Sequence, residues 1–152
     1  MIEHDPNFLD QLRRHEGLRL TPYRCTGGAL TIGCGHNLDA HPLCGYDGVS
    51  PISEETAEAL LLADVERAAE ELDRVFSWWA DMNHPRQAVL LNMAFNLGLP
   101  RLRGFKKALA AMRAGDWNTA GKEMLASKWA RDVKGRAAEL ASQMVLGAWL
   151  EG

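Results

Sequence analysis

Two acidic residues stand at positions of predicted helices where an apolar side chain would be expected. Glu16 follows Leu12 by four residues at the end of an amphipathic segment. Asp64 lies between Leu61 and Ala68 on the apolar stripe of a second, longer segment. A buried carboxylate is costly unless it is paired or protonated. Each acid is therefore either solvated at a half-exposed helix edge or functional, and a partly desolvated Glu16 would hold a proton and suit a general acid.

The elements that would position these acids follow from capping signals and hydrophobic periodicity. Asp5 and Pro6 mark the start of a first helix, and Gly17 is well placed to end it directly after Glu16. Short β-favouring pieces broken by glycines over residues 18–35 predict a small hairpin or three-stranded sheet. Residues 37–50 are polar and rich in turn residues, which predicts a loop with room for a short helix.

Helical periodicity dominates the rest of the chain. Ser53 and the two acids after it predict the start of a long helix that reaches about residue 76. Its length of roughly 30 Å would let it connect two lobes. Residues 85–97 are apolar nearly all round, which is typical of a helix at the centre of a core. Shorter helices are expected up to Ala114 and over about 116–126, followed by a last helix whose apolar face reaches Trp149.

One domain of the α+β class accounts for these elements, and 152 residues are enough for one hydrophobic core. We expect a small β-containing lobe over about residues 17–52 and a linking helix over about 53–76. The larger helical lobe would combine about residues 1–16 with about 75–152.

Composition and charge exclude several classes of function. The net charge of −3 leaves no basic stripe, so nucleic acid is not an expected partner. No apolar run reaches the length of a membrane span, and the N-terminus lacks the pattern of an ordinary signal peptide. Three cysteines argue against a disulfide framework and fit a reducing compartment. We expect a monomer with no cofactor and no metal.

The stretch LRRHEGLRLTPYRCTGGALTIGCGHNL resembles the phage-type lysozymes, the small endolysins that cut bacterial peptidoglycan. The family pattern is Glu, eight residues, Asp or Cys, five residues, Thr, and Glu16, Cys25 and Thr31 meet both spacings. TIGCGH matches the family's signature strand and turn. ISEETAEALLLADV, NMAFNLG and WARDVKGRAAEL resemble its linking, central and closing helices, so that the likeness covers about residues 8–149.

The resemblance implies hydrolysis of the β-1,4 bond between N-acetylmuramic acid and N-acetylglucosamine, in a cleft lined by the hairpin. Glu16 would protonate the leaving sugar oxygen. Cys25 stands where many relatives have Asp, and it leaves two mechanisms open. Its thiolate could attack the anomeric carbon with retention, or Cys25 and Thr31 could orient a water with inversion. We favour inversion, because a double displacement gives Thr31 no evident task beyond hydrogen bonding.

Further residues gain expected roles from the resemblance. It implies a structural ion pair between His36 and Asp64 that ties the small lobe to the linking helix. Arg136 matches an arginine near the catalytic glutamate, and it is expected to bind substrate together with Gly35 and Asn96. The alternatives are a solvated cation for Arg136 and a hydrogen bond within the helical core for Asn96.

Two functions compete for this sequence. The first is a muramidase endolysin that acts on peptidoglycan glycan strands; it would be made in the host cytoplasm without a signal peptide and reach the periplasm through holin-type release. The second is a lysozyme-fold module that binds glycan or protein without cutting, and the presence of Glu16 favours the enzyme. Oxidation of Cys34 or Cys44 onto Cys25 would disable the enzyme; three free thiols are the alternative.

Overall fold

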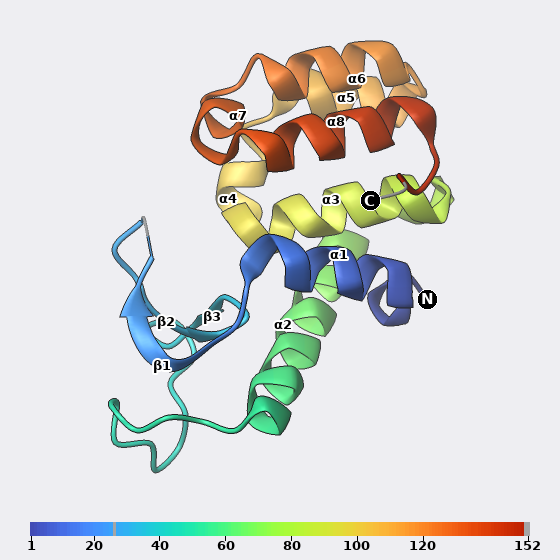
Figure 1. Cartoon of the computed structure of the whole chain (residues 1–152). Coiled ribbons are helices and arrows are strands. Elements are labelled where there is room, and N and C mark those ends of the chain that lie inside the picture. Colours follow the sequence, from blue (N-terminus) through green and yellow to red (C-terminus); the bar gives the residue numbers. More distant parts are fainter. Residues whose placement is uncertain (26, 151–152) are drawn as a thin grey trace.

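The computed structural model describes residues 1–25 and 27–150 of the chain. A three-stranded antiparallel sheet and its loops form a small lobe, and a larger group of helices forms the rest of the molecule (Figure 1). This is the α+β architecture that the sequence predicts. No helix among the described residues is long and apolar enough to cross a membrane.

The first helix belongs to the helical lobe and leads directly into the sheet. A 3-10 turn, η1 (Ile2–His4), precedes α1 (Pro6–Glu16). The Asp5 carboxylate accepts a hydrogen bond from the Asn7 backbone N–H and caps the helix. Gly17 ends it with a positive φ of 70°. Because Phe8 and Leu12 are fully buried, α1 is fixed against the helical core and holds its last residue at the junction of the lobes (Figure 1).

The sheet has the order β1-β2-β3, built from β1 (Arg19–Arg24), β2 (Leu30–Gly33) and β3 (His36–Asn37). Tyr23 of β1 lies opposite Thr31 of the central strand. The loop over residues 38–53 holds turns and bends but no helix, so the short helix allowed for within 37–50 does not form.

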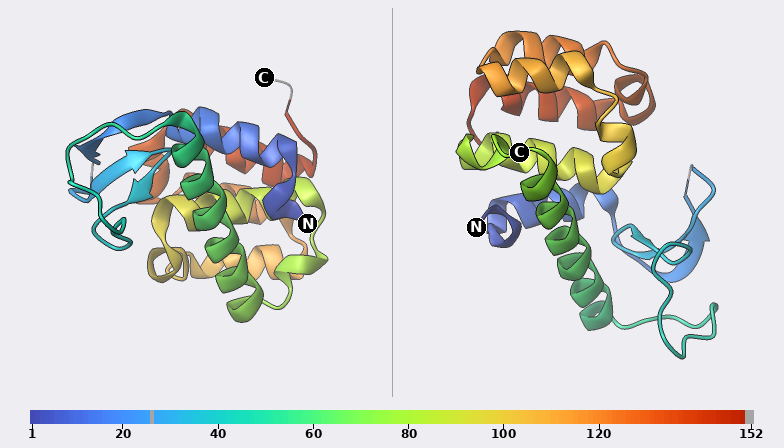
Figure 2. Two further views of the ribbon diagram at one scale, coloured as in Figure 1. Left: turned by 90° about the horizontal axis from the view of Figure 1, so that it is seen from below. Right: turned by 180° about the vertical axis from the view of Figure 1, so that it is seen from behind.

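The long helix α2 (Glu54–Val75) connects the small lobe to the helical lobe, as Figure 2 shows from two further sides. The Ser53 hydroxyl caps it by accepting from the Thr56 backbone N–H at 3.0 Å. One face is buried at helical spacing by Ala57, Leu61, Val65, Ala69 and Leu72. The helix packs against β2 and β3 near its start and against α3 and α4 further along.

The core is centred on α3 (His84–Leu97), which follows the short turn η2 (Trp79–Asp81). Every residue from Gln87 to Ala94 is buried, as expected for a helix surrounded by α1, α2 and α8. The backbone then passes through α4 (Leu99–Leu102), α5 (Lys106–Ala114), α6 (Trp117–Leu125), α7 (Lys128–Val133) and α8 (Gly135–Leu146).

Two details of the C-terminal helices differ from the sequence prediction. The prediction missed α7, a six-residue helix that Ser127 caps by accepting from the Ala130 backbone N–H at 3.1 Å. It also extended the last helix too far, because α8 ends at Leu146, where Gly147 adopts the left-handed conformation with φ of 65°. A C-terminal glycine is a stronger stop signal than an apolar pattern that happens to continue beyond it.

A buried pair joins the sheet to α2. The Nδ1 atom of His36 lies 2.8 Å from an oxygen of Asp64, and the two side chains are 4% and 10% exposed. The Nε2 atom of His36 lies 2.9 Å from the His41 carbonyl oxygen, while Arg67 donates to the other Asp64 oxygen at 2.9 Å. The hydrogen bond with Asp64 raises the pKa of His36 against the opposing effect of burial.

We predict that Asp64→Asn destabilises the protein in a pH-dependent way. Because the pKa of His36 is raised, its contribution to stability is fully present below the unfolded value of 6.5 and is lost as the pH rises through the folded value. Breaking a buried pair costs about 3 kcal/mol, which corresponds to a fall in Tm of about 6–12 °C at pH 6. Calorimetry at pH 6 and pH 9 checks this prediction; an equal loss of Tm at both pH values would contradict it.

Candidate active site

A cleft of about 490 Å³ lies between the small lobe and the helical lobe. The three residues of the Glu-Cys-Thr pattern line it together, although they come from the end of α1, the loop after β1, and β2. Gly35 and Asn96 line the same cleft, and so do residues that the sequence did not single out, among them Tyr23, Arg67, Phe95, Arg101 and Asp132.

Glu16 is held by one strong contact inside the cleft wall. The Nη2 atom of Arg136 donates to Glu16 Oε1 at 2.8 Å, and the two side chains are 15% and 10% exposed for Glu16 and Arg136. Arg136 itself does not line the cleft; it lies behind the carboxylate. The contact leaves Oε2 as the oxygen of Glu16 that is free for chemistry.

Gly35 lies against that second oxygen. Its φ of 82° favours glycine, and a Cβ placed there would come within 2.9 Å of Glu16 Oε2 and 3.2 Å of the Phe95 ring. A side chain at residue 35 would therefore displace the Glu16 carboxylate. This position of Gly35, in the turn between β2 and β3, gives it a role in shaping the site whether or not it touches substrate.

Cys25 and Thr31 face the cleft from the small lobe. Thr31 is 4% exposed and its hydroxyl donates to the Ala29 carbonyl oxygen at 2.9 Å. Partial burial raises the pKa of the Cys25 thiol, but hydrogen bonds from the backbone of Ala29 and Gly27 outweigh burial, with the Thr31 side chain close by, and the pKa is lowered. The loop thus favours the thiolate, the form that accepts protons and attacks carbon.

The other two cysteines lie apart from this environment. Cys25, Cys34 and Cys44 are all free thiols in the structure. Cys34 is buried, and burial raises the pKa of its thiol, whereas Cys44 is exposed. Cys25 is the cysteine whose surroundings suit chemistry.

Asn96 on α3 is engaged by a buried indole. Trp129 of α7, which is 4% exposed, donates its Nε1 hydrogen to Asn96 Oδ1 at 2.7 Å. The amide nitrogen of Asn96 has no such partner among the described residues and Asn96 lines the cleft, so it can donate to a ligand there. The hydrogen bond within the core and the contact with substrate are therefore compatible.

The junction between α7 and α8 directs Arg136 towards Glu16. Lys134 adopts φ of 51°, a strained value for a residue with a side chain, and it reverses the chain immediately before α8 begins. Arg136 then lies in the first turn of α8. Its Nε and Nη2 atoms donate to Oδ1 of Asn92 at 3.1 and 2.8 Å, which fixes the guanidinium beside Glu16.

Sequence reasoning missed Asn92, although the sequence contains a signal for it. Asn92 is fully buried in the middle of α3, where Leu91 and Met93 on either side are apolar. A buried amide within an apolar helix requires hydrogen-bond partners, and here it finds Arg136 and His15. Only the tertiary structure shows which partners these are.

The family model for phage lysozyme matches residues 13–143 of the chain. The chain belongs to the phage lysozyme family. It has the α+β, lysozyme-like fold of that family, and the match spans the site from Glu16 to Arg136.

Three relatives are similar to most of the chain. It is 34% identical to the pre-baseplate central spike protein Gp5 of Enterobacteria phage T4, over 94% of this chain and 28% of the spike protein. It is 32% identical to an endolysin of Bacillus phage B103, over 80% of this chain and 43% of the endolysin. An endolysin of Acyrthosiphon pisum secondary endosymbiont phage 1 is 28% identical over 79% of this chain and 75% of its own length. The chain thus spans less than half of the first two relatives.

We predict that brief alkylation with iodoacetamide at pH 7.5 modifies Cys25 and spares Cys34. The lowered pKa of Cys25 supplies thiolate in an open cleft, whereas Cys34 is buried and its pKa is raised. Peptide mass spectrometry measures each site, with exposed Cys44 as the reference for an accessible thiol. Equal labelling of Cys25 and Cys34 in the folded protein would contradict this assignment.

Proposed function

We propose that this phage lysozyme family member hydrolyses the β-1,4 bond between N-acetylmuramic acid and N-acetylglucosamine in peptidoglycan. One observation carries the proposal: Glu16, Cys25 and Thr31 line a single cleft, and Arg136 binds the Glu16 carboxylate. Glycoside hydrolysis needs an acid for the leaving oxygen and a second group on the other side of the sugar. The cleft offers both from opposite lobes.

Glu16 acts as the general acid in this proposal. Arg136 occupies Oε1, so the proton is carried by Oε2, which faces Gly35 and the cleft. Oε2 gives this proton to the bridging oxygen as the glycosidic bond breaks, and a carboxylate forms. The Arg136 guanidinium stabilises this developing negative charge, which makes its contact stronger in the transition state than in the ground state.

Cys25 and Thr31 act on the opposite side of the sugar ring. We propose that the Cys25 thiolate takes a proton from a water held by the Thr31 hydroxyl, and that this water attacks the anomeric carbon with inversion. The hydrogen bonds that lower the pKa of Cys25 favour the thiolate that this role needs, and Thr31 lies beside the thiol. Asn96 donates to the substrate from the helical side.

The biological setting is that of an endolysin. We propose that the chain is made in a host cytoplasm, passes through holin-type pores and acts as a monomer on peptidoglycan in the periplasm. The endolysin names of two relatives support this setting. Similarity to a phage spike protein over 94% of the chain favours a second setting, in which the same fold serves as a component of a virion.

We predict that Glu16→Gln abolishes peptidoglycan hydrolysis, with a loss of at least about 10³-fold, because an amide has no proton to give. Turbidity of outer-membrane-permeabilised cells and release of reducing ends from purified peptidoglycan measure the activity. Glu70→Gln, on an exposed position of α2, is the matched control and should retain full activity. A Glu16→Gln variant as active as the native protein would refute an enzymatic role for this site. If the native protein binds peptidoglycan but does not hydrolyse it, the non-catalytic module is favoured.

The anomeric form of the first product should be the α anomer, which is the inverted one. Proton NMR recorded within the first minutes of reaction distinguishes it from the β anomer. Cys25→Asp should remain active, because a carboxylate can also take a proton from water, and Cys25→Ala should lose activity roughly 10²-fold or more. A β anomer together with a trapped thioglycoside on Cys25 would replace this mechanism by double displacement.

A further inference from the structure

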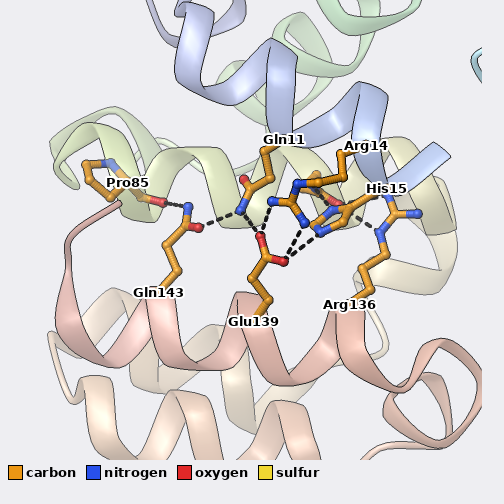
Figure 3. Close-up of polar contacts among 8 residues, drawn as sticks. Gln11, Arg14, His15, Pro85, Arg136, Glu139 and Gln143 are labelled. Carbon is orange, nitrogen blue, oxygen red and sulfur yellow. Dashed lines mark hydrogen bonds and ion pairs between the residues drawn. The ribbon is translucent and has the colours of Figure 1, made fainter. Parts of the chain in front are cut away.

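A polar network joins α1, α3 and α8 (Figure 3) and lies beside Arg136, the partner of Glu16. Glu139 of α8 accepts hydrogen bonds from Arg14 at 2.8 and 2.9 Å and from Gln11 at 2.7 Å. Gln11 also donates to Gln143 at 2.7 Å, and Gln143 donates to the Pro85 carbonyl oxygen at 2.7 Å. One member of this network, His15, immediately precedes Glu16 in the chain.

The donors and acceptors among Arg136, Asn92 and His15 can be assigned by starting from Arg136. Arg136 has only donors, so Oδ1 of Asn92 must accept both of its bonds. The amide nitrogen of Asn92 is therefore the atom that faces Nδ1 of His15, at 3.1 Å. Because that nitrogen can only donate, Nδ1 of His15 must accept and carries no hydrogen.

The remaining ring nitrogen faces Glu139. His15 Nε2 lies 3.2 Å from Glu139 Oε1, a close ionic contact, but it makes no aligned hydrogen bond there. A hydrogen on Nε2 beside a carboxylate is electrostatically favourable. The ring therefore has one hydrogen, on Nε2, and a side chain that is 6% exposed.

We propose that His15, as its neutral Nε2–H tautomer, is a positioning residue that holds Arg136 on Glu16 through Asn92. This inference rests on the proposed function for the identity of the reaction, but the tautomer follows from the hydrogen bonds alone. Each link requires the next: His15 orients the Asn92 amide, Asn92 fixes the guanidinium, and the guanidinium fixes Glu16 Oε1.

Protonation of His15 would break this chain of contacts. With hydrogens on both nitrogens, His15 would present a donor to the donating amide of Asn92. Rotation of that amide would relieve the conflict but would turn its nitrogen towards Arg136, which also only donates. Either outcome loosens Arg136 and with it the catalytic carboxylate.

The charged groups around His15 influence the pH at which its ring gains a proton. Glu139 and Arg136 on α8, Arg14 on α1 and the neutral Asn92 on α3 lie around the ring, and Glu16 is the next residue in the chain. Burial lowers the pKa of His15, and Arg136 and Arg14 lower it further, against the attraction of Glu139. Arg14 in turn holds the pKa of Glu139 at about 2, so that its charge is constant over the working range. His15 is therefore neutral at pH 7 and gains a proton only at a pH below 6.5.

The first test needs no activity. Two-dimensional NMR of the ring nitrogens in uniformly ¹⁵N-labelled protein at pH 7 should show His15 protonated at Nε2 and bare at Nδ1. A ring protonated at Nδ1, or charged at pH 7, would overturn the proposal even if the enzyme is fully active.

The second test separates positioning from stability. His15→Gln retains an acceptor for Asn92, so its kcat on soluble peptidoglycan at pH 7 should stay within about threefold of the native value. Because glutamine cannot titrate, the fall of kcat at acidic pH should move to lower pH in this variant. His15→Leu removes the acceptor and should lower kcat roughly tenfold with little change in KM. Gln143→Met breaks the same helix interface away from Asn92; it should lower Tm but leave kcat and its pH profile unchanged.

The outcomes distinguish the two proposals. If the native protein does not hydrolyse peptidoglycan while His15 has the expected tautomer, the proposed function fails and the hydrogen-bond assignment stands. If the native protein is active but His15→Leu matches Gln143→Met in kcat and pH profile, His15 is merely structural and the positioning role is wrong.

Discussion

The ion pair between Arg136 and Glu16 is the interaction on which the site depends. It joins residues that are 120 positions apart, one at the end of α1 and the other in the first turn of α8. Both side chains are largely buried, so neither charge is well hydrated, and removing one partner would leave the other uncompensated. The pair therefore requires α1, α3 and α8 to pack in one arrangement. The core around α3 provides that arrangement, and Asn92 supplies the hydrogen bonds that make burial of the guanidinium tolerable.

Two buried histidines show how geometry determines charge. His36 makes a 2.8 Å hydrogen bond with Asp64 that outweighs burial, so its pKa is raised and the pair ties the small lobe to α2. His15 also lies beside a carboxylate, but without an aligned hydrogen bond, and burial lowers its pKa. The protonated form of histidine is thus favoured in one place and the neutral form in the other. Lowering the pH therefore favours the charged form of His36 but disturbs the contacts of His15.

The candidate catalytic residues are positioned in two different ways. Glu16, Asn96 and Arg136 are carried by helices whose positions are set by the core, which gives them precise placement. Cys25 lies in the loop after β1. Backbone groups within four residues of it, together with Thr31, lower the pKa of its thiol. The hydrogen bonds that favour a negative charge there come mainly from the backbone, so they do not depend on the side chain of a neighbouring residue.

The sequence by itself determined the class of fold, the long linking helix, the buried central helix and the family, because capping residues, periodicity and the Glu-Cys-Thr spacing are local signals. It also pointed to Glu16 and Asp64 as acids in unusual places. It overran the end of α8 at Gly147 and missed α7, where local signals are weak or conflict. The resemblance already placed Arg136 near Glu16. Only the tertiary structure decided which carboxylate oxygen Arg136 binds, that Asn92 and His15 support it, and that Gly35 leaves room for Oε2. Those contacts join segments far apart in the chain. The packing of the helices brings these segments within hydrogen-bonding distance, and no local sequence pattern encodes that packing.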